Sequence, residues 1–323
     1  MNKIHKTLLF LAALFVAGGV HAQGYPNRPV KVVVPWPPGQ ATDLAARIVA
    51  DKLSQQMGQQ FIIENKPGAG GAIGTEQVVK SPPDGYTLLA ASSGPISIMP
   101  NLQKTPYDPL TDLAPVSLTN AVPFALVVHP SFPATNAKEF IAVVRANPGK
   151  YTFSSSGTGA TAHLFAELFN SMAQLKAVHV PYKGTAAAMT DLIGGQISYA
   201  VETVAATVGH IKSGRLKAFG VTSSHRTAAL PDLAPLAEAA GLAGYDCVAW
   251  GGYMAPRGTP REILERLAAE IQKAVLAADL KERFVTLGMD TASSSPEQMA
   301  AFMRREQDRY GTIIKNADIK IER

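Results

Sequence analysis

The chain has 323 residues, of which 46% are hydrophobic and 17% charged, and its formal net charge is +5. This composition excludes a disordered chain, and at ~100 to 200 residues per domain it predicts about two domains. The basic residues are scattered, which excludes a nucleic-acid-binding surface, and the single cysteine, Cys247, excludes an intramolecular disulfide.

The N-terminus predicts a secretory signal peptide over residues 1–22. Lys3 and Lys6 precede an apolar run over 8–20, and Val20 and Ala22 occupy the −3 and −1 positions of an A-x-A-like cleavage site. A short membrane anchor is the alternative, but the run is shorter than the ~20 apolar residues that span a bilayer. Removal of this segment lowers the formal net charge from 30 − 25 = +5 to 28 − 25 = +3.

From residue 30 onward, β-rich runs alternate with helical patterns, which is typical of βαβ units in an α/β fold. Residues 92–115 contain five prolines and are expected to be irregular surface. The first series is expected to contain strands over 30–34, 61–63, 86–90, 116–118 and 124–128, and helices from about Asp43 and over 73–80.

A second alternating series follows, and the chain ends in helices. Its expected strands cover 151–154, 178–180, 197–201 and 216–222, and its expected helices cover 160–172, 185–193 and 203–212. The last quarter returns through 248–254 to helices over 260–276 and 296–310. Because two series precede a helical tail, we predict two lobes with chain crossovers near Val122 and Val248.

The first candidate site joins the end of a buried strand to a helix N-terminus. Ligands of open α/β sheets bind beyond the carboxyl ends of strands, and a helix N-terminus presents free N–H groups to an anion. Trp36, among three prolines, provides a rigid aromatic surface that helix capping does not require. We expect Thr42 or Asp43 to cap the helix in any case. The candidate ligand-binding residues are Trp36, Pro38, Gly39, Gln40, Thr42 and Asp43.

The second candidate site is a Ser/Thr/Gly-rich segment that again joins a strand to a helix. Its hydroxyl and N–H groups can hold carboxylate oxygens without a charged side chain. A Ser-His-Asp triad is not excluded by chain order, but His163 shares the loop and helix of Ser156, which disfavours triad geometry. The candidate residues are Ser156, Gly157, Thr158, Thr161 and His163.

Three further features have two interpretations each. Glu202 ends an apolar strand and either accepts a hydrogen bond from a ligand or caps the next helix together with Thr203. The glycine-rich segment 64–74 fails the dinucleotide template because Ile73 replaces its third glycine, so we favour a close backbone turn over a nucleotide site. Cys247 lies in an apolar run and is expected to be a buried hydrophobe rather than a nucleophile. The histidine spacing does not predict a metal site.

A set of short motifs occurs in a fixed order along the mature chain. They include Pro37-Pro38-Gly39, the run 64–74, Asp84-Gly85-Tyr86, Pro106-Tyr107-Asp108-Pro109, His179-Val180-Pro181-Tyr182-Lys183-Gly184 and Gly258-Thr259-Pro260. In this set the chain resembles the Bug-type solute receptors of tripartite tricarboxylate transporters. The resemblance covers essentially the whole mature chain.

The resemblance implies a type II periplasmic binding protein of the Venus-flytrap kind, with a ligand cleft between two lobes and a hinge crossed twice. Residues 23–122 and 249–323 would form lobe 1, and residues 123–248 lobe 2. Members bind small carboxylates such as amino acids, di- and tricarboxylic acids or aromatic acids. The resemblance implies that a ligand carboxylate contacts the loop at 36–43 and the loop with Ser92 and Ser93. It also implies that the second-lobe loop at 156–161 helps to close over the ligand.

Two positions depart from the family pattern. Gln40 stands where the family usually has a second glycine, and Glu202 stands where it more often has aspartate. We expect a monomeric periplasmic receptor, without cofactor, metal or enzymatic activity, that delivers its carboxylate to membrane permease subunits. The alternatives are a secreted serine hydrolase using Ser156 and a nucleotide-dependent enzyme using the glycine-rich segment.

Overall fold

The computed structural model describes residues 24–320, so the predicted signal peptide lies outside the described residues. Ten strands form its sheet. They are β1 (Val30–Val34), β2 (Phe61–Asn65), β3 (Thr87–Ser92), β4 (Leu113–Val128), β5 (Thr152–Ser155), β6 (Val178–Pro181), β7 (Tyr199–Thr203), β8 (Lys217–Val221), β9 (Val248–Pro256) and β10 (Asp290–Thr291).

Helices cover this sheet and connect its strands. They are α2 (Ala41–Met57), η1 (Ala69–Gly71), α3 (Ala72–Val79), η2 (Gly94–Ile98), α4 (Met99–Leu102), α5 (Ala137–Arg145), α6 (Thr161–Met172), α7 (Thr185–Ile193), α8 (Val204–Lys212), α9 (Leu236–Ala239), α10 (Arg261–Leu276), α11 (Ala278–Thr286) and α12 (Pro296–Asn316).

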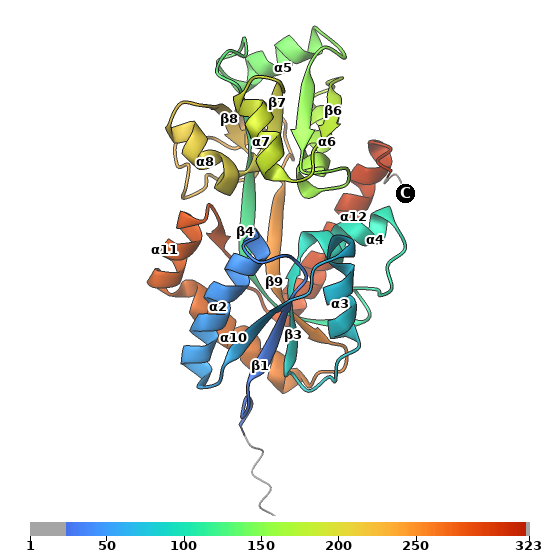
Figure 1. Ribbon diagram of the computed structural model, residues 1–323, viewed down its shortest axis with the longest axis vertical. Helices are drawn as coiled ribbons and strands as arrows, with labels where there is room; N and C mark the ends of the chain where they lie inside the picture. Colours follow the sequence, from blue (N-terminus) through green and yellow to red (C-terminus); the bar gives the residue numbers. More distant parts are fainter. Residues whose placement is uncertain (1–23, 321–323) are drawn as a thin grey trace, which may run out of the picture.

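The strands fall into two groups that β4 and β9 connect (Figure 1). The strand order is β2-β1-β3-β9-β4-β7-β5-β6, and β8 and β10 also pair with β4. We call the group around β1, β2 and β3 the first lobe and the group around β5, β6, β7 and β8 the second lobe. Within each lobe the pairs β1–β2, β1–β3, β5–β6 and β5–β7 are parallel, as βαβ units require. The predicted α/β architecture with two lobes is confirmed.

The connection between the lobes is a ladder of two long strands. Residues 113–123 of β4 pair with β9, whereas residues 124–128 pair with β7 and β8. Val122 pairs with Ala249, and Pro123 pairs with Val248. The two crossover positions predicted from the sequence therefore lie beside each other in one antiparallel ladder.

Apolar packing on both sides of the sheet follows the predicted periodicities. The stripe of Ala45, Val49 and Leu53 on α2 is buried against the first-lobe strands, with at most 4% of each residue exposed. The second lobe is centred on aromatic rings, and the ring of Phe140 lies 5.0 Å from that of Tyr199. Cys247 is fully buried, and burial raises the pKa of its thiol to about 12, which confirms the prediction of a buried hydrophobe.

The expectation of irregular surface over residues 92–115 was wrong for both ends of the segment and right for residues 103–112, which form neither helix nor strand. The first part contains η2 and α4, and β4 already begins at Leu113. Pro95 and Pro100 each stand in the first turn of a helix, where the missing N–H has no intrahelical acceptor and costs nothing. Ile96 and Ile98 of η2 are buried, so this turn belongs to the core.

Other boundaries also differ from the prediction. The separate strands expected at 116–118 and 124–128 are one strand, β4, because the intervening residues pair with β9 through two register shifts. The strand expected at 197–201 is β7, which begins two residues later, and α12 continues to Asn316 rather than ending at 310. The prediction also lacked α5 and α11.

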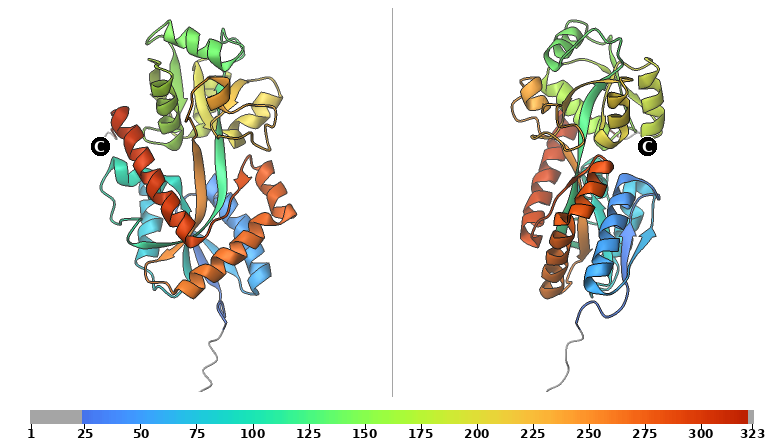
Figure 2. Two further views of the ribbon diagram at one scale, coloured as in Figure 1. Left: turned by 180° about the vertical axis from the view of Figure 1, so that it is seen from behind. Right: turned by 90° about the vertical axis from the view of Figure 1, so that its left-hand side faces the viewer.

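The last helix, α12, lies along the back of the β4–β9 ladder and reaches the second lobe (Figure 2). Its Tyr310 ring stacks on Phe165 of α6 at 6.2 Å, and Arg309 donates to the carbonyl of Asp246 at 2.6 Å. Within residues 24–320, none of the helices has the length and apolar character needed to cross a membrane.

Candidate functional site

The structure brings Trp36 and Ser92 together at the carboxyl ends of β1 and β3. The indole Nε1 of Trp36 donates to Ser92 Oγ at 2.9 Å. The next residue, Ser93, is 2% exposed, and its Oγ accepts from the backbone N of Trp250 at 2.9 Å. Ser92 therefore orients the indole, whereas Ser93 connects β3 to β9.

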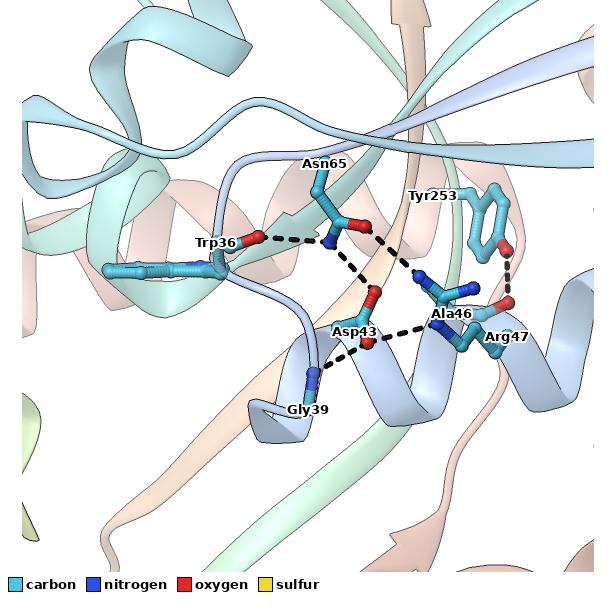
Figure 3. A network of polar contacts seen from close by, with 7 residues as sticks. All are labelled: Trp36, Gly39, Asp43, Ala46, Arg47, Asn65 and Tyr253. Atoms are coloured by element: carbon cyan, nitrogen blue, oxygen red, sulfur yellow. Dashed lines mark hydrogen bonds and ion pairs between the residues drawn. The ribbon is translucent and has the colours of Figure 1, made fainter.

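Asp43 organises the first-lobe loop from inside the protein (Figure 3). Its carboxylate is 1% exposed and accepts from Gly39 N at 2.8 Å, from Arg47 Nε at 3.0 Å and from Asn65 Nδ2 at 2.8 Å. The same Asn65 amide donates to the carbonyl of Trp36 at 3.0 Å. Burial alone would raise the pKa of Asp43, but these hydrogen bonds and the Arg47 charge outweigh it and lower the pKa.

The expectation that Thr42 or Asp43 caps α2 was wrong. The N-cap is Gln40, whose side chain makes no capping hydrogen bond, and Asp43 stands at the third helical position. Asp43 instead reaches back to Gly39, which adopts a φ of 85° that favours glycine. Across the described residues, no protein acceptor meets the amides of Ala41 and Thr42. The exposed residues Pro38, Gly39 and Gln40 border this helix end.

The second candidate loop ends at a similarly uncapped helix. The N-cap of α6 is Ala160, without a side-chain hydrogen bond. Thr158 is exposed, and Ser156 and Thr161 are half-exposed. In the part of the chain that the structure describes, these three side chains have no protein partner. The loop therefore presents three hydroxyl groups beside an uncapped helix N-terminus.

His163 does not extend this row of hydroxyl groups. It is 4% exposed, and its Nδ1 accepts from Gly159 N at 3.1 Å. At this loop, the imidazole that contacts a serine is His179, whose Nε2 lies 2.7 Å from the Oγ of Ser155, not of Ser156. Within residues 24–320, the only carboxylate that pairs with either ring is that of Glu167, which faces His163. The geometry gives no support to a triad on Ser156.

Glu202 lies at the carboxyl end of β7 and is 3% exposed. One oxygen accepts from Thr203 N at 2.7 Å, and the other accepts from Thr185 Oγ1 at 3.2 Å. Burial is the largest influence on this carboxyl group and raises its pKa. The side chain that caps α8 is that of Thr203, whose Oγ1 accepts from Ala206 N. A ligand contact of Glu202 stays a prediction.

The glycine-rich segment is filled by contacts within the protein. A Cβ atom on Gly74 would lie 2.7 Å from the carbonyl of Lys66 and 2.9 Å from Pro35 Cα. A Cβ atom on Gly71, which has a φ of 92°, would lie 3.1 Å from Pro95 Cγ. The interpretation as a close backbone turn is confirmed. Within residues 24–320, no group of three or more His, Cys, Asp or Glu side chains is arranged to hold a metal ion.

Sequence reasoning missed four residues that shape these loops: Arg47, Asn65, Ser155 and His179. The spacing of Asp43 and Arg47 was a usable signal, because residues i and i+4 on a helix face each other. The contact between Ser155 and His179 depends on the pairing of β5 with β6, in which Phe153 faces His179. A single sequence does not encode that register locally.

The sequence profile described as "Tripartite tricarboxylate transporter family receptor" matches residues 45–319. Protein BugT of Bordetella pertussis is 35% identical over 319 residues, which cover 97% of this chain and 97% of that protein. A solved structure of the periplasmic binding protein BugD is 35% identical, with a TM-score of 0.76, and the match covers 92% of this chain and 100% of that one.

Two further solved structures contain carboxylates. Rpa4515 of Rhodopseudomonas palustris, determined with adipate, is 33% identical with a TM-score of 0.80, and the match covers 92% of this chain and 99% of that one. MatC of the same organism, with bound malate, is 31% identical with a TM-score of 0.75, and the match covers 90% and 100% of the two chains.

Proposed function

The chain belongs to the tripartite tricarboxylate transporter receptor family, and from this premise we propose that it captures a small carboxylate between its two lobes and delivers it to a membrane permease. The adipate and malate in two similar structures support ligands of this size and charge. The signal peptide expected over residues 1–22 and the periplasmic description of BugD support a location in the periplasm.

The observation that carries the proposal is the pair of uncapped helix N-termini behind the two candidate loops. The α2 end offers the amides of Ala41 and Thr42 beside Trp36, and the α6 end offers the hydroxyl groups of Ser156, Thr158 and Thr161. Each N-terminus carries a partial positive charge that favours an anion. A carboxylate can bind at such ends without an arginine or lysine in the loop.

We propose that the lobe boundaries fall at 122/123 and 248/249, so that β4 and β9 form the hinge. The pairing of Pro123 with Val248 supports this placement, because both strands then bend at one level. Rotation about two adjacent strands changes few contacts within either lobe. The protein would act as a monomer and without catalysis, and its ligand would leave unchanged.

A thermal-shift comparison of acids with their amides tests the proposed function. Adipate and malate should stabilise the protein, with about 2.7 kcal/mol at a hundredfold excess over Kd, whereas adipamide and malamide should not. Equal stabilisation by acid and amide would contradict an anion site at the helix ends. A covalent adduct of a serine-reactive phosphonate on Ser156, detected by mass spectrometry, would instead favour a hydrolase.

A further inference from the structure

Two imidazole rings are stacked beneath the second-lobe loop. The centroids of His163 and His179 are 3.8 Å apart, and their planes differ by 9°. Phe153 of β5 lies against the pair, with its ring centroid 4.9 Å from that of His179. The rings belong to α6 and β6, so the stack connects two elements that border the loop.

Each ring makes a hydrogen bond to a different end of the loop. At the end near the helix, His163 Nδ1 accepts from Gly159 N at 3.1 Å. At the end near the strand, His179 Nε2 lies 2.7 Å from Ser155 Oγ, which in turn accepts from Gly157 N at 3.2 Å. The segment that carries Ser156 and Thr158 is thus held at both ends by one stack.

Resting on the proposed function, we propose that the His163–His179 stack is a positioning device for the ligand loop, and that a proton on His163 releases the loop and weakens carboxylate binding. Neither ring is a ligand-contacting group in this assignment. His163, a candidate ligand contact in the sequence, acts through the backbone of Gly159 instead.

The hydrogen bond to Gly159 determines which nitrogen of His163 carries the proton. A ring nitrogen that accepts a hydrogen bond is unprotonated, so the neutral ring has its hydrogen on Nε2. That nitrogen lies 3.5 Å from Glu167 Oε1. A second proton must bind Nδ1, where it replaces the lone pair that holds the Gly159 N–H. The buried Gly159 amide then has no acceptor.

The groups around the stack distinguish its two rings. Glu167 from α6 is the carboxylate that faces His163. Burial and the neighbouring His163 together lower the pKa of His179 to about 4, so His179 remains neutral above pH 5. Tyr199 from β7, whose ring stacks on Phe153 at 5.6 Å, has a pKa far above this range because it is buried. We therefore assign the proton of the proposed release to His163.

The first measurement needs no ligand. Nitrogen-15 NMR of histidine-labelled protein at pH 8 should show His163 with a bare Nδ1 and a protonated Nε2. On titration to pH 5, protonation of His163 and loss of hydrogen-exchange protection at the Gly159 amide should share one midpoint. A neutral ring with the hydrogen on Nδ1, or exchange at Gly159 that does not change with the titration, would overturn the inference.

The second measurement uses calorimetry with adipate and malate between pH 8 and pH 5. His163→Asn keeps an acceptor near the position of Nδ1 but does not titrate, so its Kd should stay within a few-fold of the wild-type value at pH 8 and stay constant on acidification. His163→Leu removes the acceptor and should raise Kd by about 5- to 150-fold at every pH, the cost of an unsatisfied buried amide.

The matched control is His129→Asn, at the end of β4 with Ser131 as its partner, which should keep the wild-type pH profile. A wild-type Kd that is constant from pH 8 to pH 5, or a His163→Asn profile as steep as the wild-type one, would contradict the inference. Absence of carboxylate binding at pH 8 in the wild type would contradict the proposed function alone, because the NMR titration still tests the stack.

Discussion

Asp43 illustrates how a buried charged residue can order a candidate loop from inside the protein. Its three hydrogen-bond donors come from the loop, from its own helix and from the end of β2. Because both oxygens are occupied and the residue is buried, the carboxylate has no exposed edge for a ligand. The Gly39 amide is taken up by Asp43, while the residues Pro38, Gly39 and Gln40 of the loop are exposed.

We expect Asp43→Asn to destabilise the fold by about 1 to 3 kcal/mol, because an amide offers one acceptor oxygen where the carboxylate offers two charged ones. The lowered pKa of Asp43 means that its stabilisation exists above its unfolded pKa of ~3.9 and disappears as the pH falls through the lower folded value. Urea unfolding at pH 7 and pH 3 should therefore show a smaller pH effect in the variant. An identical pH effect in both proteins would refute this role.

Gln40 is the residue at which ligand preference can be changed with little effect on folding. It is exposed, occupies the N-cap of α2 and makes no capping bond, so Gln40→Gly removes no intramolecular hydrogen bond. We expect the unfolding free energy to change by about 0.5 kcal/mol or less. The ranking of carboxylates by Kd in calorimetry should change. An unchanged ranking would show that Gln40 does not contact the ligand.

At the scale of elements, helix starts differ in whether a side chain caps them. The N-termini of α5, α8 and α12 are capped by the side chains of Asn136, Thr203 and Ser295. Those of α2 and α6, behind the two candidate loops, are not, and neither are those of α3, α7, α9, α10 and α11. Asn136 at the N-cap and Glu139 three residues later are a typical sequence signal for a helix N-terminus. The sequence therefore contained a signal for α5 that the prediction did not use.

Ser295 provides a matched test of this difference. It forms a complete capping box with Gln298 at the start of α12. Ser295→Ala should cost about 1 kcal/mol of unfolding free energy and leave the Kd for adipate and malate unchanged. Thr158→Ala should do the reverse, with little loss of stability and a Kd raised by about 10- to 150-fold if its hydroxyl donates to the carboxylate. Parallel denaturation and calorimetry distinguish the two patterns.

At the scale of the whole molecule, β4 and β9, the proposed hinge, connect the two lobes while α12 lies across both. The contacts of Tyr310 with Phe165 and of Arg309 with Asp246 place α12 on the back of that hinge. Closure toward the ligand would therefore bend the ladder and strain the contacts that α12 makes through Tyr310 and Arg309. The two lobes are not joined by the hinge strands alone.

We expect the lobes to approach each other when ligand binds. Small-angle scattering should show a smaller radius of gyration at saturation with adipate or malate than without ligand. The neutral amides serve as the control and should leave the curve unchanged. A constant radius of gyration at proven saturation would exclude capture by lobe closure, though not binding itself.

The sequence alone determined the features that depend on neighbouring residues. Alternating apolar patterns identified the two α/β series, and α7 was predicted with both boundaries as observed. The loops that follow β1 and β5 were recognisable because strand ends and helix starts have local chemistry. The crossovers near Val122 and Val248 stay a prediction, and the two positions are adjacent in the β4–β9 ladder.

Only the tertiary structure decided which residues from distant elements meet. Asn65 reaches Asp43 because β2 pairs in register with β1, and His179 reaches Ser155 because β6 pairs in register with β5. Prolines that suggested an irregular segment are accommodated in the first turns of η2 and α4, and η2 is packed in the core through Ile96 and Ile98. Strand register and packing depend on contacts between residues that are far apart in the sequence. A local pattern in a single chain therefore does not specify them.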